Sequence, residues 1–250
     1  MTDRVVLRGR GAEVAAALRA LRTVVRTGEG AVIVLFGEPG IGKSAVLRAV
    51  LEQAGRMGFA TGESKADEID QIAPGAPLLV ALRSGSRPLL SSAAFTALAP
   101  LYDQKLWLAE RIGTLLEDIA ADNPVVVAID DVQWADRLTR FALRMLIGRL
   151  SRSPVAWVLT SRLAPATVAE ELVGAVEGTV PVVRLSLGLL TPEDIDEMAA
   201  ERLGRPPSPA VRDLLRRVGG NPFWTAQLLE GLDWRGNPVP QAWASFAVSR

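Results

Sequence analysis

The stretch Gly37-Glu38-Pro39-Gly40-Ile41-Gly42-Lys43-Ser44 directly follows the apolar run Ala-Val-Ile-Val-Leu-Phe of residues 31–36. It matches the pattern G-x-x-x-x-G-K-[ST], with a predicted strand before it and a predicted helix over residues 45–57 after it. Glycines let successive backbone N–H groups point at a phosphate, and the following helix N-terminus adds partial positive charge. The sequence therefore predicts a phosphate-binding loop rather than a turn that binds nothing.

Each part of this loop has an expected role. The Lys43 ammonium is expected to reach the β- and γ-phosphates of a nucleotide, and the Ser44 hydroxyl to coordinate Mg²⁺. The remaining loop residues, together with Ala45 at the start of the helix, are expected to contact the nucleotide.

Two adjacent acids end a second apolar strand, which is predicted over residues 124–130. Asp130 is expected to hold the Mg²⁺ ion, and Asp131 to orient or polarise the attacking water. An ordinary acidic turn is the alternative, but the phosphate loop upstream favours the functional interpretation. Hydrolytic motors usually carry Glu at the second position. Because Asp is one methylene shorter, the pattern predicts slow hydrolysis.

Composition excludes several kinds of chemistry. The 250 residues include no cysteine and no histidine, which removes disulfides, thiolate nucleophiles, zinc clusters and histidine-based catalysis. The 28 basic residues balance the 28 acidic ones, so net charge gives no reason to expect nucleic acid as the main partner. Neither a signal peptide nor a membrane-spanning run is visible, so we expect a cytoplasmic protein without a membrane partner.

Strands and helices alternate along the first three quarters of the chain. Strands are predicted over residues 31–36, 58–64, 124–130, 155–161 and 180–187, and helices over residues 12–26, 45–57, 103–121 and 137–150. This order predicts an α/β fold with a doubly wound parallel sheet. Residues 66–100 are broken by Pro, Gly and Ser, and their pattern predicts no element.

Only helices are predicted after residue 190. Thr191-Pro192 and Ser208-Pro209 each resemble an N-cap followed by proline in the first helical turn. The expected organisation is a core domain over residues 1–188, a helical lid over residues 189–232 and an unassigned tail over residues 233–250.

The chain resembles the signal-transduction ATPases with numerous domains, a branch of the AAA+ superfamily. Within that branch it is most similar to the ATPase module of large ATP-binding LuxR-type transcriptional regulators. The resemblance covers about residues 5–232. It rests on LRGRGAEVAAAL (residues 7–18), the phosphate loop, IDDVQWAD (129–136), VLTSR (158–162) and GGNPFWTAQLL (219–229).

The resemblance implies a five-stranded P-loop NTPase sheet of the AAA+/ASCE type with a C-terminal helical lid. It places the Arg162 strand between the phosphate-loop strand and the Asp130 strand. It also implies that Arg10 lies near the nucleotide, that Arg162 senses the γ-phosphate and that Pro222 packs on the adenine or ribose. Arg10 as a loop cap and Pro222 as a helix start are the alternatives. The implied cofactors are ATP or ADP and Mg²⁺.

The function that follows is an ATP- and Mg²⁺-binding switch with slow hydrolysis in a signalling or transcription-control protein. Self-association through the ATPase domain is a further expectation. No DNA-binding domain is visible in the sequence, so we expect no operator binding by this chain alone. The alternatives are an AAA+ motor acting on DNA, a P-loop small-molecule kinase and a nucleotide binder without hydrolysis.

Two other patterns are left outside the predicted site. Residues 64–67, Ser-Lys-Ala-Asp, resemble the guanine-specificity motif of GTPases, but they have the wrong first residue and precede the carboxylate strand. Arg137, Arg140 and Arg144 share one helix face, where they form a solvated basic surface, an arginine finger or a nucleic-acid contact.

Overall fold

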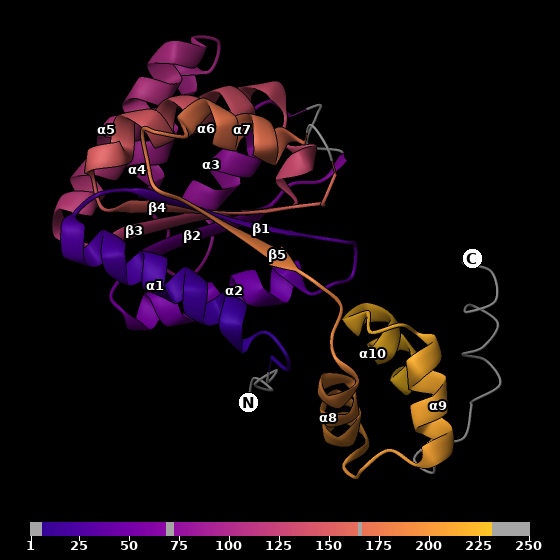
Figure 1. The fold of residues 1–250 in the computed structure, drawn as a ribbon. Coiled ribbons are helices and arrows are strands. Elements are labelled where there is room, and N and C mark those ends of the chain that lie inside the picture. Colours follow the sequence, from indigo (N-terminus) through magenta and orange to yellow (C-terminus); the bar gives the residue numbers. More distant parts are fainter. Residues whose placement is uncertain (1–6, 69–72, 165–166, 232–250) are drawn as a thin grey trace. The chain divides into compact units, whose positions relative to one another are not determined.

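The computed structural model describes residues 7–68, 73–164 and 167–231 (Figure 1). The chain divides into two compact units. The larger unit comprises Glu13–Gly37 and Lys43–Ser186, and the smaller unit comprises Met1–Ala12, Glu38–Gly42 and Leu187–Arg250. The predicted tail over residues 233–250 lies outside the described residues, and the predicted boundaries at residues 188 and 232 stay predictions.

A five-stranded sheet forms the centre of the larger unit. Its strands are β1 (Ala31–Gly37), β2 (Ala60–Lys65), β3 (Val125–Asp130), β4 (Val155–Ser161) and β5 (Val182–Leu187), in the order β2-β3-β4-β1-β5. The pairs β1–β4, β3–β4 and β2–β3 are parallel. Every residue of β1, β3 and β4 is buried, as expected for apolar strands covered on both faces. The predicted α/β sheet is confirmed, and β4 lies between β1 and β3.

Helices cover both faces of this sheet (Figure 1). One face carries α1 (Gly11–Thr27) and α2 (Lys43–Arg56). The other carries α3 (Ala76–Arg83), α4 (Ser92–Thr96), α5 (Lys105–Asp122), α6 (Arg137–Arg149) and α7 (Val168–Val176). Buried side chains of this second layer meet the sheet in one large cluster that includes Leu116, Leu143, Val173, Ile129 and Trp157. Short 3-10 helices in the described ranges include η2 (Ala99–Leu101), η3 (Val132–Trp134) and η4 (Leu150–Arg152).

Three helices of the larger unit are absent from the sequence prediction. α3 and α4 lie within residues 66–100, where Pro and Gly hide the helical pattern. α7 begins at an N-cap, since the Thr167 hydroxyl accepts a hydrogen bond from the Glu170 N–H. Its buried side chains are Ala169, Leu172, Val173 and Val176. This helical spacing was available in the sequence and would have identified α7.

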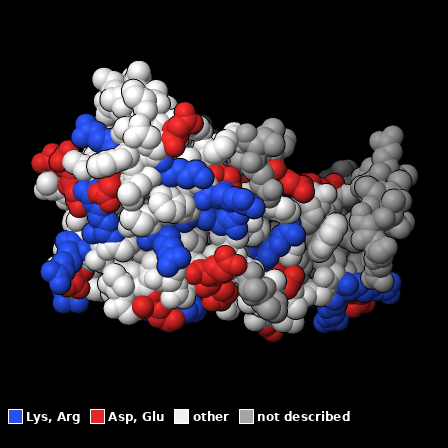
Figure 2. All heavy atoms as spheres, turned by 90° about the horizontal axis from the view of Figure 1, so that it is seen from above, with Lys and Arg blue, Asp and Glu red and all other residues white. Residues whose placement is uncertain are grey.

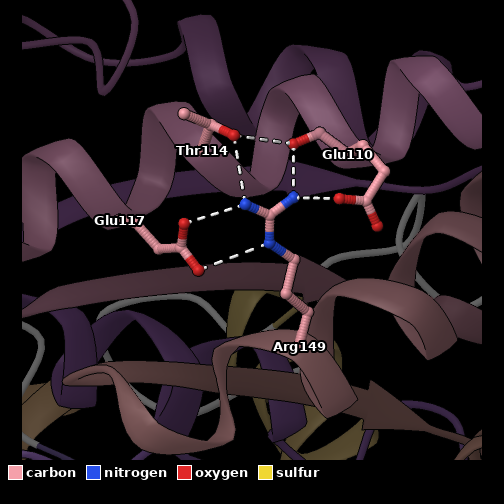
Figure 3. A network of polar contacts seen from close by, with 4 residues as sticks. All are labelled: Glu110, Thr114, Glu117 and Arg149. Atoms are coloured by element: carbon pink, nitrogen blue, oxygen red, sulfur yellow. Dashed lines mark hydrogen bonds and ion pairs between the residues drawn. The ribbon is translucent and has the colours of Figure 1, made fainter.

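Arg149 at the end of α6 forms hydrogen bonds and ion pairs with residues of α5 (Figure 3). One terminal nitrogen donates to the main-chain oxygen of Glu110 at 2.7 Å and also pairs with the Glu110 carboxylate. The other donates to Thr114 Oγ1 at 3.1 Å and to Glu117 Oε2 at 2.8 Å. The hydrogen bond to Glu117 raises the pKa of Arg149. A Cβ at Gly113 would lie 2.9 Å from Arg149 Cδ, so glycine leaves the space that this side chain occupies.

Replacing Arg149 by methionine is expected to lower the free energy of unfolding by about 2 kcal/mol, because several hydrogen bonds to charged groups are lost together. Urea denaturation of both proteins measures this difference. Arg149→Lys is the control: it keeps the charge but loses the planar fork, so we expect a smaller loss. A loss below about 0.5 kcal/mol for Arg149→Met would show that the network behaves as an ordinary surface ion pair.

The smaller unit contains a helical subdomain. Its helices are α8 (Pro192–Leu203), α9 (Pro209–Arg217) and α10 (Pro222–Glu230). Thr191 and Ser208 cap α8 and α9 through their hydroxyls, and proline lies in the first turn of each helix, as predicted. Leu190, Ile195, Ala199, Val211, Leu215, Leu228 and Leu229 form its own apolar core. The all-helical nature predicted after residue 190 is thus confirmed for the described residues.

Candidate functional site

The two predicted carboxylates lie at the carboxyl end of β3, where Thr160 of the neighbouring strand connects them. Asp130 is only 5% exposed, and its Oδ1 accepts a hydrogen bond from Thr160 Oγ1. The same hydroxyl oxygen accepts from the Asp131 N–H at 2.8 Å. Sequence analysis missed Thr160. Its position could have revealed it, because Thr160 directly follows the apolar run Val-Ala-Trp-Val-Leu of residues 155–159.

Asp131 has an unusual backbone. With φ 55° and ψ 45° it is the one non-glycine residue with positive φ in the described part of the chain. Asp tolerates this conformation better than bulky residues, and such strained positions cluster at functional sites. Gln133 Nε2 donates to Asp131 Oδ1 at 3.0 Å, and Lys65 Nζ lies 3.5 Å from Oδ2. Both carboxylate oxygens therefore have protein partners.

Lys65 is a second residue that sequence analysis did not place in the site. It was considered only as part of the Ser-Lys-Ala-Asp pattern. Because β2 and β3 pair in parallel, with Lys65 opposite Asp130, the lysine ends its strand beside the acidic pair. The neighbouring Glu63 has a raised pKa, chiefly because burial disfavours its charged form, with a smaller contribution from Asp130.

The glycine-rich loop that the sequence predicts to bind phosphate begins where β1 ends, and α2 begins at Lys43. Lys43 is 6% exposed, and its ammonium donates to the main-chain oxygen of Gly37 at 2.8 Å. Gly40 and Gly42 have φ of 75° and 101°, which other residues adopt only with strain. Since β1, β4 and β3 are neighbours, their carboxyl ends bring Lys43, Thr160 and Asp130 to the same edge of the sheet.

Arg162 follows β4 at this edge. Its guanidinium lies 5.3 Å from the centre of the Trp134 ring, a cation–π arrangement. Trp134 belongs to η3, directly after the acidic pair, and it packs against the hydrophobic cluster. The contact holds the exposed Arg162 side chain near the segment that carries Asp130 and Asp131.

In the smaller unit, Arg10 connects two main-chain segments. Its side chain is 4% exposed and donates to the carbonyl oxygen of Ile41 at 2.9 Å and to that of Gly188 at 2.6 Å. Ile41 belongs to the phosphate loop, and Gly188 precedes the helical subdomain. A buried guanidinium in this place fixes the loop backbone relative to the start of that subdomain.

The N-terminus of α10 contacts the same loop. Asn221 caps α10 by accepting from the N–H groups of Phe223 and Trp224, and its Nδ2 donates to the Pro39 oxygen at 3.1 Å. The Phe223 N–H also lies 3.2 Å from the Gly40 oxygen. A Cβ at Gly40 would lie 2.7 Å from the Cβ of Phe223, so only glycine allows this approach. Pro222 occupies the first turn of α10.

The predicted magnesium site would offer the ion only a few protein ligands. The described residues contain no cluster of three or more acidic ligands. A buried Asp130 and the Ser44 hydroxyl would supply only part of a coordination shell, which suits Mg²⁺ because this ion keeps waters and phosphate oxygens as ligands. Ser64 and Ser161, at the ends of β2 and β4, have buried hydroxyls without a hydrogen-bond partner in the structure. Ordered water would satisfy them.

A parallel sheet in this strand order, with a glycine-rich loop after β1 and two acids after β3, defines an α/β P-loop NTPase fold. Residues 6–158 match the family model of the AAA ATPase domain, and the chain belongs to this family. A comparison with curated protein sequences found no match.

Several solved structures share the fold. A signal transduction ATPase with numerous domains and a tetratricopeptide repeat sensor, from Pyrococcus horikoshii, is 18% identical with a TM-score of 0.55, covering 96% of this chain and 32% of that one. The Aeropyrum pernix ORC1 protein in complex with DNA is 18% identical with a TM-score of 0.61, covering 97% and 65%. The ORC2 protein of the same organism, in ADPNP–ADP complexes, is 15% identical with a TM-score of 0.61, covering 91% and 63%.

These identities establish the fold alone. The chain spans from about a third to about two thirds of the length of these proteins. None of the helices in the described ranges has the length and apolar character needed to cross a membrane.

Proposed function

We propose that this AAA ATPase domain binds ATP with Mg²⁺ and acts as a nucleotide-controlled switch with slow hydrolysis. The observation that carries this proposal is the contact of α10 with the phosphate loop, in which Asn221 and Phe223 hydrogen-bond to loop carbonyls. A loop that changes its backbone when phosphate binds would change these two hydrogen bonds. The helical subdomain would thereby respond to the nucleotide.

The residues at the sheet edge would bind the triphosphate. The loop N–H groups of residues 37–45 would surround the phosphates, and Lys43 would exchange its contact with the Gly37 oxygen for phosphate oxygens. Ser44 and Asp130 would hold a magnesium ion, which supplies charge neutralisation at the β- and γ-phosphates when bound. Thr160 keeps the Asp130 carboxylate in place through its hydroxyl.

Slow hydrolysis agrees with the state of Asp131. A general base must accept a hydrogen bond from the attacking water, but Gln133 and Lys65 contact both oxygens of this carboxylate. Each oxygen can still accept a further hydrogen bond, but the attacking water then competes with Gln133 and Lys65 for positions around this carboxylate. These contacts and the shorter side chain of Asp compared with Glu both slow the activation of water. Slow hydrolysis favours a switch over a motor.

Three further predicted site residues are assigned positioning and contact roles. Arg10 would lie near the nucleotide as part of its binding site, and its two carbonyl contacts would hold the loop and the start of the lid together. Pro222, in the first turn of α10 beside Asn221, would pack on the adenine or ribose. Arg162 would move from the Trp134 ring to the γ-phosphate.

The wider role proposed is regulation of a signalling or transcription-control protein of the LuxR type, in the cytoplasm, with self-association of the ATPase domain as a consequence of ATP binding. This part rests on the resemblance of the motifs at residues 7–18 and 219–229. Turnover at the rate of motor enzymes would instead favour an AAA+ motor acting on DNA.

Replacing Arg162 by alanine tests the switch. ATP affinity is expected to fall by about tenfold, which corresponds to about 1.4 kcal/mol, while ADP affinity changes little, because only ATP carries the γ-phosphate. Titration calorimetry with both nucleotides measures the two ratios. Arg111→Ala, on the exposed surface of α5, is the matched control. Equal losses for ATP and ADP would contradict a γ-phosphate role.

A further inference from the structure

A hollow of about 290 Å³ lies on the larger unit between α6 and α7. α6 contributes Arg137, Arg140, Phe141 and Arg144, and α7 contributes Val168, Glu171, Leu172 and Ala175. Figure 2 looks onto the helical face of this unit and shows basic side chains gathered near its middle, with acidic side chains between and around them. None of these eight residues belongs to the nucleotide site described above.

Among the described residues, the basic side chains of this hollow have no anionic partner. In the described ranges, neither an ion pair nor a side-chain hydrogen bond engages Arg137, Arg140 or Arg144. Arg140 Nε is fully buried without an acceptor, although a buried donor left unsatisfied costs free energy. The three arginines recur at helical spacing and span about 10 Å along the helix axis. They form a row of donors that suits carboxylates.

The rest of the hollow is mostly apolar. Phe141 is 37% exposed and lies in the arginine row, and Val168, Leu172 and Ala175 face it from α7. A groove between two helices, apolar inside and basic along one wall, accommodates a segment that carries acidic and apolar side chains on one face. Such a segment would cover Phe141 and supply the acceptor that Arg140 lacks.

Charge favours a peptide over a nucleic acid as the occupant. Glu171 on the α7 wall repels any anion, so an occupant must keep its negative charges on the α6 wall. Nucleic-acid affinity rises with the number of phosphates neutralised, and the three arginines provide few such contacts in a chain with no net charge. A peptide can place all its carboxylates on the side that faces the α6 arginines, whereas a nucleic acid carries a phosphate at every nucleotide.

We propose that the hollow between α6 and α7 binds an acidic, amphipathic segment of a partner protein, with its carboxylates on Arg137, Arg140 and Arg144 and an apolar side chain on Phe141. Arginine and carboxylate form paired hydrogen bonds, which gives this surface its selectivity. None of the lining residues belongs to the proposed nucleotide site, so peptide binding is measured without ATP.

The experiment measures fluorescence anisotropy of a labelled acidic amphipathic peptide of about 14 residues, with glutamates at helical spacing beside leucines. The full chain without nucleotide is expected to bind it with a Kd of about 10 μM, and more weakly as salt rises. Arg137→Glu/Arg144→Glu, which changes two exposed side chains, is expected to weaken binding at least about tenfold. Phe141→Ala is expected to weaken it about fivefold, because the apolar contact is lost.

Two controls decide the outcome. Arg111→Glu/Arg152→Glu changes the same charge at exposed positions elsewhere in the larger unit and is expected to leave binding unchanged. Thermal melts of all variants test for folding. The proposal is overturned if the folded charge variant binds the peptide as tightly as the original chain or if the original chain does not bind it. Tighter binding of a single-stranded oligonucleotide of the same length also overturns it, since nucleic acid would then be the occupant.

Discussion

Lys43→Ala is expected to weaken ATP binding at least about 100-fold, which corresponds to about 2.7 kcal/mol. The ammonium is the sole cation of the phosphate loop, and it lies in a buried position where its charge is poorly screened. Its hydrogen bond to the main-chain oxygen of Gly37 holds it near the end of β1, where the loop begins. Titration calorimetry with ATP and Mg²⁺ measures the change.

The matched control uses another of the three lysines of this chain. Lys105, exposed at the start of α5, lies outside the proposed site, and Lys105→Ala is expected to bind ATP normally. Circular dichroism must show that Lys43→Ala remains folded, because the side chain is buried. If the folded variant retained its affinity for ATP, the phosphate-loop assignment would be wrong.

Asp131→Asn is expected to bind ATP with nearly unchanged affinity and to release phosphate at least about 100 times more slowly. Asparagine has the same shape and also tolerates positive φ, so the backbone at this position should be preserved. It cannot accept a proton from the attacking water, which is the step assigned to the carboxylate. Single-turnover hydrolysis of labelled ATP, beside calorimetry of binding, separates the two effects.

Lys65 provides a complementary control for this assignment. Its ion pair with Asp131 involves a lysine side chain that is 65% exposed, so it contributes at most about 1 kcal/mol. Lys65→Met frees one carboxylate oxygen and is expected to raise turnover by up to about fivefold. Unchanged phosphate release in Asp131→Asn would assign the base to another residue, and slower release in Lys65→Met would give the lysine a supporting role.

Local pattern was sufficient for much of the architecture. The apolar runs at residues 31–36, 124–130 and 155–161 became buried strands because their β-branched residues suit a sheet covered on both faces. The helix starts at Thr191 and Ser208 followed from cap chemistry, which depends on neighbouring residues only. The helices within residues 66–100 were missed because short segments gain most of their stability from tertiary packing.

The sequence by itself determined the glycine-rich turn after β1, the acidic pair at the end of β3 and the α/β class, because glycines and alternating apolar runs act through local backbone geometry. Only the tertiary structure brought Thr160 and Lys65 to Asp130 and Asp131, and placed Asn221 on the loop at Pro39. Such contacts join residues far apart in the chain, as the separation of 182 positions between Asn221 and Pro39 shows. The order of the strands in the sheet and the packing of the helices decide these contacts. The periodicity of apolar residues along the chain reveals neither of them.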